Sequence, residues 1–215
     1  MVVDLGTNAG FVSSTPSADP AGTAAAWGIM ILGQKDTSPA GNNRVTEIGF
    51  YQDKSIEVSV DYDVAIYDHD SINDKPDDII GSSTGNALIT SAKAWNVVTG
   101  LNISLTASTA YWVVARIDDD PNTLINYSSD SGSREMDGPM GSSLPDPWNN
   151  VGDAYDDYSY AMFAKYESVD VGTGINIGDS WKAVDITAMQ INIGDTWKAV
   201  AGMQVNIGDV WKEIF

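Results

Sequence analysis

The chain has 215 residues, of which 43% are hydrophobic, and this is enough for one large all-β domain with an appendage. Its 30 acidic and 11 basic residues give a formal net charge of −19, so we expect repulsion from phosphate backbones and no nucleic-acid partner. With no cysteine and one histidine, the chain excludes disulfides, thiolate catalysis, Cys-based zinc sites and an HExxH metalloprotease motif.

The first residues, "MVVDLGTNAG", lack a basic region followed by an apolar stretch. The most apolar run, 24–33, is too short to cross a bilayer and predicts a buried strand instead. We therefore expect neither a signal peptide nor membrane insertion.

Alternating apolar and polar residues predict strands through most of residues 1–167. This alternation occurs at 44–51, 55–68, 101–107 and 158–167. The continuous apolar run 110–117 predicts a central strand, and we expect Trp27, Trp95 and Trp112, which lie in or beside strands, in the core. Clusters of Gly, Pro, Asn and Asp predict loops at 36–43, 70–78, 118–122 and 130–147. Short strands joined by such loops predict an all-β fold, a jelly-roll-like antiparallel β-sandwich.

The sequence divides into a β-sandwich domain at 1–167, a linker at 168–174 and three β-hairpin repeats at 175–215. The charge is divided unevenly between these parts. Residues 1–167 carry 24 acidic and 8 basic residues, whereas residues 168–215 carry 6 and 3.

The C-terminal segment contains three versions of one ten-residue phrase. They are "INIGDSWKAV" from Ile175, "INIGDTWKAV" from Ile191 and "VNIGDVWKEI" from Val205. A hairpin with a three-residue loop beginning at Gly-Asp would place Ile177 opposite Trp181, Ile193 opposite Trp197 and Ile207 opposite Trp211. The Ile and Trp side chains would then share one face, and the Asn and Lys side chains the other.

A single hairpin cannot bury its own apolar face, and an exposed ribbon of Ile and Trp would aggregate. We therefore expect those six residues to mediate homo-oligomerisation, most simply as a trimer, or docking to other proteins of an assembly. The alternative is a local meander that closes the sandwich of the same chain.

Both parts resemble known families. The body resembles a β-sandwich domain of bacteriophage and environmental surface proteins in the phrases at 35–51, 64–83, 95–120, 144–148 and 158–167. The repeats look like the Trp-Lys hairpin repeats at the ends of bacteriophage structural proteins, and viral fibre shafts wind repeats of about this length into trimers. The resemblance implies a non-catalytic surface module or a carbohydrate-binding-like module, with no catalytic residues to transfer.

Trp148 lies in the loop "LPDPWNN", close to the Tyr-rich stretch "AYDDYSY". An exposed aromatic ring with polar neighbours can bind the face of a sugar, which makes Trp148, Asn149 and Tyr155 candidate glycan-binding residues. The alternative is that Trp148 anchors its loop by plugging the end of the sandwich.

The acidic loops are candidate calcium sites, because calcium takes six to eight oxygen ligands. The candidate ligands are Asp68, Asp70, Asp74, Asp118 and Asp120, although their spacing fits no EF-hand. The alternative is a solvated, solubilising surface. No cofactor other than calcium is expected, and no Gly-x-Ser-x-Gly elbow or distinctive carboxylate pair suggests an enzyme.

The leading hypothesis is a non-enzymatic structural protein of the virion surface: a phage head fibre, a capsid decoration protein or a tail fibre component. It would contact other virion proteins and display the sandwich outward. One alternative is a secreted or cell-surface carbohydrate-binding module. Another is a self-assembling surface-layer or filament subunit, which would form open-ended polymers.

Overall fold

The computed structural model describes most of the chain and divides it into two compact units, Met1–Val169 and Asp170–Phe215. The described ranges are 3–26, 31–41, 43–53, 60–88, 93–117, 124–131, 134–137, 143–148, 154–155, 158–169, 173–176, 181–184, 190–193, 196–199, 204–207 and 210–213. These residues form strands and loops, and none of them belongs to a helix that could span a membrane.

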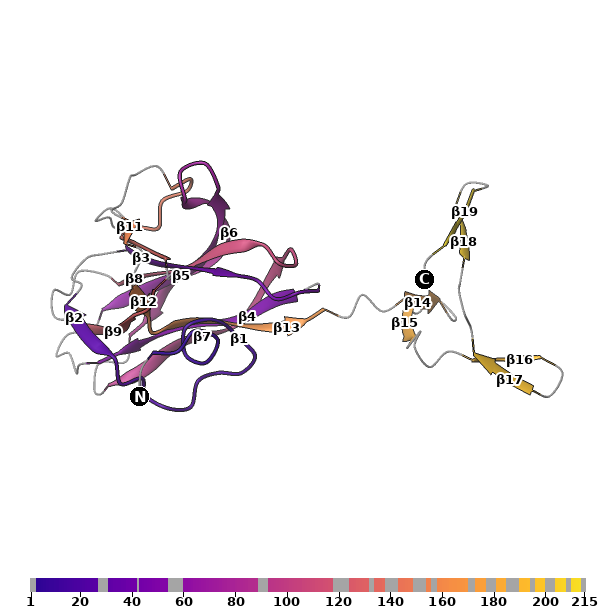
Figure 1. The fold of residues 1–215 in the computed structure, drawn as a ribbon, viewed down its shortest axis with the longest axis horizontal. Coiled ribbons are helices and arrows are strands. Elements are labelled where there is room, and N and C mark those ends of the chain that lie inside the picture. The colour runs from indigo at the N-terminus through magenta and orange to yellow at the C-terminus, as the bar shows by residue number, and fades with distance from the viewer. Residues whose placement is uncertain are drawn as a thin grey trace. The chain divides into compact units, whose positions relative to one another are not determined.

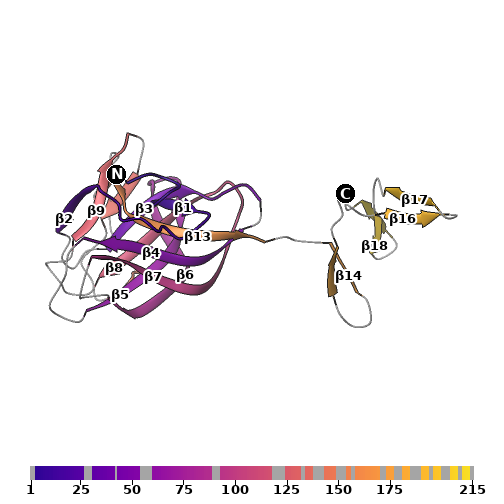
Figure 2. The ribbon, with the colours of Figure 1, turned by 90° about the horizontal axis from the view of Figure 1, so that it is seen from below.

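The first unit, here called the body, contains two β-sheets (Figures 1 and 2). The seven-stranded sheet comprises β1 (Gly10–Val12), β2 (Thr23–Ala26), β4 (Asn43–Gln52), β7 (Ala94–Leu105), β9 (Leu124–Ser129), β12 (Tyr158–Tyr160) and β13 (Met162–Ser168). The six-stranded sheet comprises β3 (Ile31–Thr37), β5 (Asp61–Asp70), β6 (Lys75–Ala87), β8 (Ala110–Ile117), β10 (Arg134–Asp137) and β11 (Ala154–Tyr155).

Most neighbouring strands are antiparallel. In the seven-stranded sheet, β13 and β7 pair with opposite edges of β4, and β1 pairs with β13 in parallel. At one end of this sheet β2, β9 and β12 form a short antiparallel group, in which β9 lies between the other two. The six-stranded sheet has the order β11-β10-β3-β8-β5-β6.

The main core lies between the two sheets. Side chains of both sheets point into it, such as Phe50 and Met162 from one sheet and Ile66 and Val113 from the other, and all four are fully buried. Two sheets that share one apolar interior explain why the body can be stable by itself. The predicted all-β fold is thus confirmed.

Smaller clusters cover the outer faces of both sheets. Val3 and Ala9 from the N-terminal segment pack with Tyr51 and Ala161 on the seven-stranded sheet, with Trp95 against them. On the six-stranded sheet, Trp148 packs over a second group. That group consists of Ile31, Ala65, Tyr67, Trp112 and Val114.

Several sequence predictions need correction. The predicted strand at 24–33 is two strands, β2 and β3, which belong to different sheets. The predicted loop at 70–78 ends early, because β6 starts at Lys75, and the predicted loop at 130–147 contains β10. Trp112 is buried as expected, Trp95 is partly buried, and Trp27 lies outside the described residues.

The second unit contains three two-stranded antiparallel sheets. They pair β14 (Thr173–Asn176) with β15 (Trp181–Val184), β16 (Gln190–Ile193) with β17 (Thr196–Ala199), and β18 (Gln204–Ile207) with β19 (Val210–Glu213). The predicted linker at 168–174 overlaps strand at both ends, because β13 ends at Ser168 and β14 begins at Thr173.

The register of these hairpins differs by one residue from the predicted register. Trp197 lies opposite Asn192, and Ile193 lies opposite Thr196. Asn176 and Asn206 lie opposite Trp181 and Trp211 in the same way. The predicted pairing of Ile193 with Trp197 and of Ile207 with Trp211 is therefore wrong, and Ile177 lies outside the described residues.

Candidate functional site

Trp148 is the central residue of the predicted glycan site, and the structure buries it. Its side chain is 1% exposed, and its ring meets the ring of Tyr67 edge-on at 5.3 Å. Its backbone N–H donates to the Asp77 carbonyl at 2.7 Å, and its carbonyl accepts from Lys75 Nζ at 3.4 Å. A sugar platform needs an exposed ring, so this role for Trp148 is wrong. Trp148 does anchor its loop, but on the outer face of the six-stranded sheet and not at the end of the sandwich.

Neighbouring contacts hold the Trp148 loop to the six-stranded sheet. The Tyr67 hydroxyl donates to the Pro145 carbonyl at 2.6 Å, and Asp146 accepts from the Ile79 N–H at 3.1 Å. Burial, with the charge of Asp146 nearby, raises the pKa of Tyr67, so this hydroxyl keeps its proton and remains a donor. Asn149 lies outside the described residues, and Tyr155 is placed only as a residue of β11.

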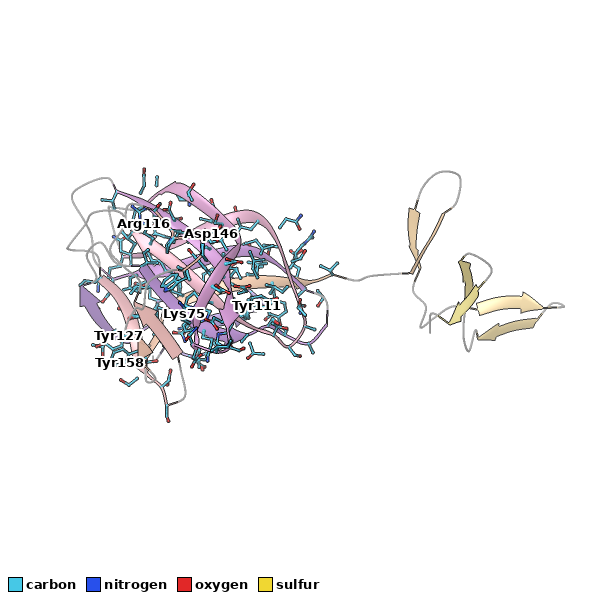
Figure 3. All side chains as sticks on the ribbon, turned by 90° about the horizontal axis from the view of Figure 1, so that it is seen from above. Lys75, Tyr111, Arg116, Tyr127, Asp146 and Tyr158 are labelled. Atoms are coloured by element: carbon cyan, nitrogen blue, oxygen red, sulfur yellow. The ribbon has the colours of Figure 1, made fainter. Side chains whose placement is uncertain are left out.

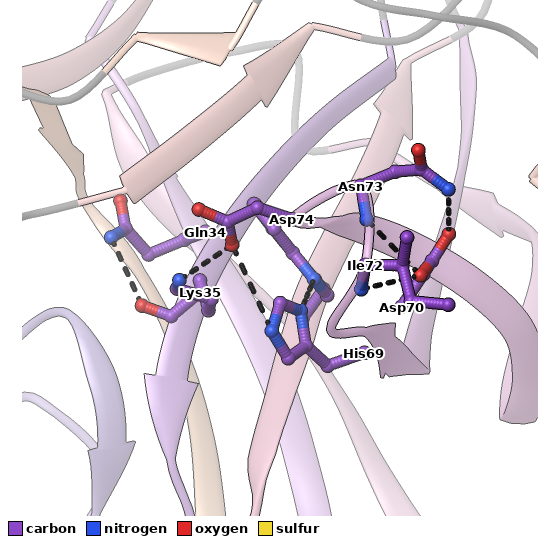
Figure 4. Close-up of polar contacts among 8 residues, drawn as sticks. Gln34, Lys35, His69, Asp70, Ile72, Asn73 and Asp74 are labelled. Atoms are coloured by element: carbon purple, nitrogen blue, oxygen red, sulfur yellow. Dashed lines mark hydrogen bonds and ion pairs between the residues drawn. The ribbon is translucent and has the colours of Figure 1, made fainter.

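His69 joins a polar network on the same sheet (Figure 4). Its Nδ1 accepts from Trp112 Nε1 at 3.2 Å, and its Nε2 lies 3.7 Å from Asp74 Oδ1. Lys35 Nζ contacts the same carboxylate oxygen at 2.7 Å and lies 5.9 Å from the centre of the Trp112 ring. Among the described residues, His69 meets a tryptophan and an aspartate but no nucleophile, so the network ties β3, β5 and β8 together without forming a Ser-His-Asp arrangement.

The aspartates predicted to bind calcium are used for local hydrogen bonds. Asp68 accepts from the Asp78 N–H at 2.7 Å, and Asp70 accepts from the N–H groups of Ile72 and Asn73. The hydrogen bonds from Asn73 and Ile72 lower the pKa of Asp70. Within the described ranges, no group of three or more His, Asp or Glu side chains could hold a metal ion. Asp118 and Asp120 lie outside those ranges.

A groove at the end of the seven-stranded sheet was not foreseen from the sequence. It has a volume of about 320 Å³ and is lined by Ala21, Gly22, Thr23, Tyr127, Ser128 and Ser129. The sheet register places Thr23, Tyr127 and Tyr160 in one row across β2, β9 and β12, and Ser129 opposite Tyr158 in the next. The alternation of tyrosines in "YSY" was visible, but the pairing with Tyr127 depends on contacts between distant segments.

The aromatic side chains beside this groove are in contact with each other. Tyr127 and Tyr158 have ring centres 4.8 Å apart, and Tyr127 and Tyr160 have ring centres 6.4 Å apart. Tyr127 and Tyr158 are half-buried, whereas Tyr160 is fully buried. Figure 3 shows Tyr127 and Tyr158 next to one another on these strands, away from Lys75 and Asp146.

The comparisons with known proteins give no relative. No protein-family model matches the chain, and neither a curated protein nor a solved structure is detectably similar to it.

Proposed function

We propose that the chain is a non-enzymatic structural protein of a virion surface, a head fibre, capsid decoration or tail fibre component, in which the body is displayed and the hairpins join copies. The observation that carries the proposal is the shared register of the three hairpins. In each, an Asn lies opposite the Trp and the next residue toward the N-terminus lies opposite the Lys. The same surface is thus presented three times along one segment.

Two apolar rows follow from this register. Because side chains alternate along a strand, Ile191 and Ile193 belong to one side of the second hairpin, and Trp197 and Ala199 to the other. An isolated two-stranded hairpin is marginally stable in water. A hairpin with apolar residues on both faces needs another protein surface packed against each face. The equivalent hairpins of other copies can pack against these faces at each of the three repeats. A closed trimer does this without leaving an unpaired interface on any copy.

The strand order of the body supports a jelly-roll topology, which suits a displayed domain. The paths β1-β13-β4-β7 and β3-β8-β5-β6 run through the two sheets. Strands that follow one another in the chain mostly alternate between the sheets, as in two interlocked Greek keys. The parallel pairing of β1 with β13 is the one departure from an antiparallel jelly roll in these two paths.

The charge distribution suits the same division of roles. The body carries most of the acidic excess, which keeps displayed surfaces soluble and apart. The repeats carry only six acidic and three basic residues in 168–215, so charge repulsion opposes their association less. The resemblance of the repeats to those of bacteriophage structural proteins points to a virion as the assembly.

Replacing Trp181, Trp197 and Trp211 together by Ala tests the proposal in the full chain. We expect light scattering to give a trimer for the parent and a monomer with an intact body for the triple variant, because each substitution removes a large apolar side chain from the proposed interface. The matched control replaces Trp95, which packs on the body, and should leave the mass unchanged. A triple variant that assembles like the parent would refute this role of the repeats.

A further inference from the structure

We propose that His69 is an acid-operated switch: a second proton on its imidazole ring moves the ring from Trp112 to Asp74 and releases the Trp148 loop. The Trp148 loop is the segment 143–148, which packs on the outer face of the six-stranded sheet through Leu144 and Trp148. The inference goes beyond the proposed assembly role, because it concerns a conformational change within the body.

In the structure, the His69 ring accepts a hydrogen bond from the Trp112 indole. Trp112 Nε1 donates to His69 Nδ1 at 3.2 Å. Only a neutral imidazole has a ring nitrogen that can accept, and its single proton is then on Nε2. Trp112 is 0% exposed, so bulk water does not replace His69 as the acceptor while the surrounding cluster stays packed. The contact therefore exists only while His69 is neutral.

The second partner of the ring, Asp74, lies just beyond hydrogen-bond distance. His69 Nε2 is 3.7 Å from Asp74 Oδ1, and Lys35 Nζ contacts the same oxygen at 2.7 Å, as Figure 4 shows. A neutral ring gains little from a carboxylate at this distance, whereas an imidazolium is attracted to it. Protonation therefore removes the contact on one side of the ring and strengthens the contact on the other side.

Mild acid supplies the proton that operates this switch. Imidazole rings take up a second proton between about pH 5 and pH 8. The His69 side chain is 17% exposed, so solvent can deliver the proton. On Nδ1 the new proton points at the indole N–H, and two donors then face each other. A buried donor without an acceptor is costly, so the ring and the indole separate.

Trp112 connects the switch to the Trp148 loop, because both tryptophans belong to the outer cluster of the six-stranded sheet. Trp148 Nε1 is itself buried, and it has no acceptor in the described part of the chain. The loop is held mainly by packing and by backbone contacts, such as the hydrogen bond from the Trp148 N–H to the Asp77 carbonyl at 2.7 Å. When Trp112 shifts, the packing beneath Trp148 is disturbed and the loop opens more often.

Other charged groups surround His69, so the experiment separates them from the imidazole. β8 contributes the uncharged Trp112, and His69 lies opposite Pro76 of β6. The charged residues on the adjoining elements are Lys35, Asp68, Asp70, Asp74, Lys75, Asp77 and Asp146. His69→Gln leaves all of them in place, and its amide oxygen can still accept from Trp112 without titrating.

NMR of the untagged full chain, with ¹⁵N-labelled histidine and tryptophan, tests the proposal between about pH 7.5 and pH 5. His69 is the only histidine, so its ring signals are identified at once, and Trp112→Phe identifies the Trp112 indole signal. We expect the ring proton on Nε2 at the higher pH and a second proton on Nδ1 as the pH falls. The protection of the Trp112 indole and of the Trp148 amide against hydrogen exchange should fall on the order of tenfold with the same midpoint.

Three results for the parent chain would overturn the proposal. The first is a ring proton on Nδ1 at the higher pH, which excludes the hydrogen bond from Trp112. The second is a ring that does not titrate in this range. The third is a ring that titrates while the protection of both tryptophan groups stays the same.

Two variants assign the effect to its residues. His69→Gln should keep both protection factors constant over the same pH range, and an equal fall in this variant would overturn the role of His69. Asp74→Asn removes the counter-charge at a position with φ of 52°, which asparagine tolerates. It should move the loss of protection to lower pH, and an unchanged midpoint would overturn Asp74 as the partner of the protonated ring.

Discussion

At the scale of single residues, the neighbours across the fold decide what each side chain does. Trp112 lies in a continuous apolar run, and its burial in β8 could be predicted from that run alone. Trp148 lies in a loop rich in Gly, Pro and Asp, where the local sequence is compatible with exposure and with burial. Only the apolar outer face of the six-stranded sheet, with Tyr67 beneath the ring, explains its burial.

Trp148→Ala should lower the free energy of unfolding of the body by about 3–5 kcal/mol, because it leaves a cavity where one of the two tryptophans of that cluster was. Trp148→Phe, which fills part of the space, should cost less. Chemical denaturation of both variants and the parent measures the difference. A loss below about 1 kcal/mol for the alanine variant would contradict the packing described for this loop.

Because of Glu47, the free energy of unfolding of the body should depend on pH. Burial raises its pKa, but the hydrogen bonds from Lys165 and Thr15 outweigh burial and hold the pKa below the usual 4.5. The folded protein therefore favours the ionised carboxylate, and this contribution is complete above pH 4.5 and disappears as the pH falls through the lowered pKa. Unfolding of the parent and of Glu47→Gln, followed between neutral and acidic pH, should show a stability difference that shrinks on acidification. A difference that stays constant would contradict this assignment.

At the scale of elements, strands with regular alternation were predictable, and strands with polar composition were not. The pattern in 44–51 marks most of β4, and the apolar run at 110–117 matches β8. β6 contains Asp, Ser, Thr and Gly, which are typical of loops, yet it pairs along β5 at the edge of its sheet. Its residues alternate between partly buried and exposed, but the partly buried positions include Gly81 and Ser83, so the sequence shows no apolar alternation that would mark a strand.

The hairpin register shows how a correct element can be predicted with a wrong pairing. The repeated Gly-Asp marks a turn, but two-residue and three-residue loops differ by one residue in register. The pairing of Ile193 with Thr196 leaves two residues between them. Each shift of one residue exchanges the faces, so the predicted face shared by Ile and Trp becomes two separate rows.

Engineered disulfides distinguish the two registers, and the chain has no native cysteine to interfere. Gln190→Cys with Ala199→Cys joins residues that lie opposite each other, and this pair should oxidise readily. Ile191→Cys with Ala199→Cys is the control, because these positions are opposite only in the shifted register. Mass spectrometry of the oxidised proteins reads out the bond. Faster bond formation in the control pair would contradict the register described here.

At the scale of the whole molecule, composition and repeats predicted the all-β class and a separate C-terminal set of hairpins. Strong alternation, abundant turn residues and a repeated phrase are local features, so they can be recognised without the fold. The groove at the end of the seven-stranded sheet lies between β9 and β2 with the residues that precede it, and these segments are far apart in sequence. Such a site requires the topology, and no local pattern predicts which strands become neighbours.

The native mass in solution tests most directly whether the repeats assemble the protein. Light scattering on a sizing column would compare the full chain with residues 1–169, the unit that has its own core. We predict a full-length trimer of a 22.9 kDa chain and a monomeric fragment. A full-length monomer at every concentration, or an open-ended polymer, would contradict the closed assembly through the hairpins.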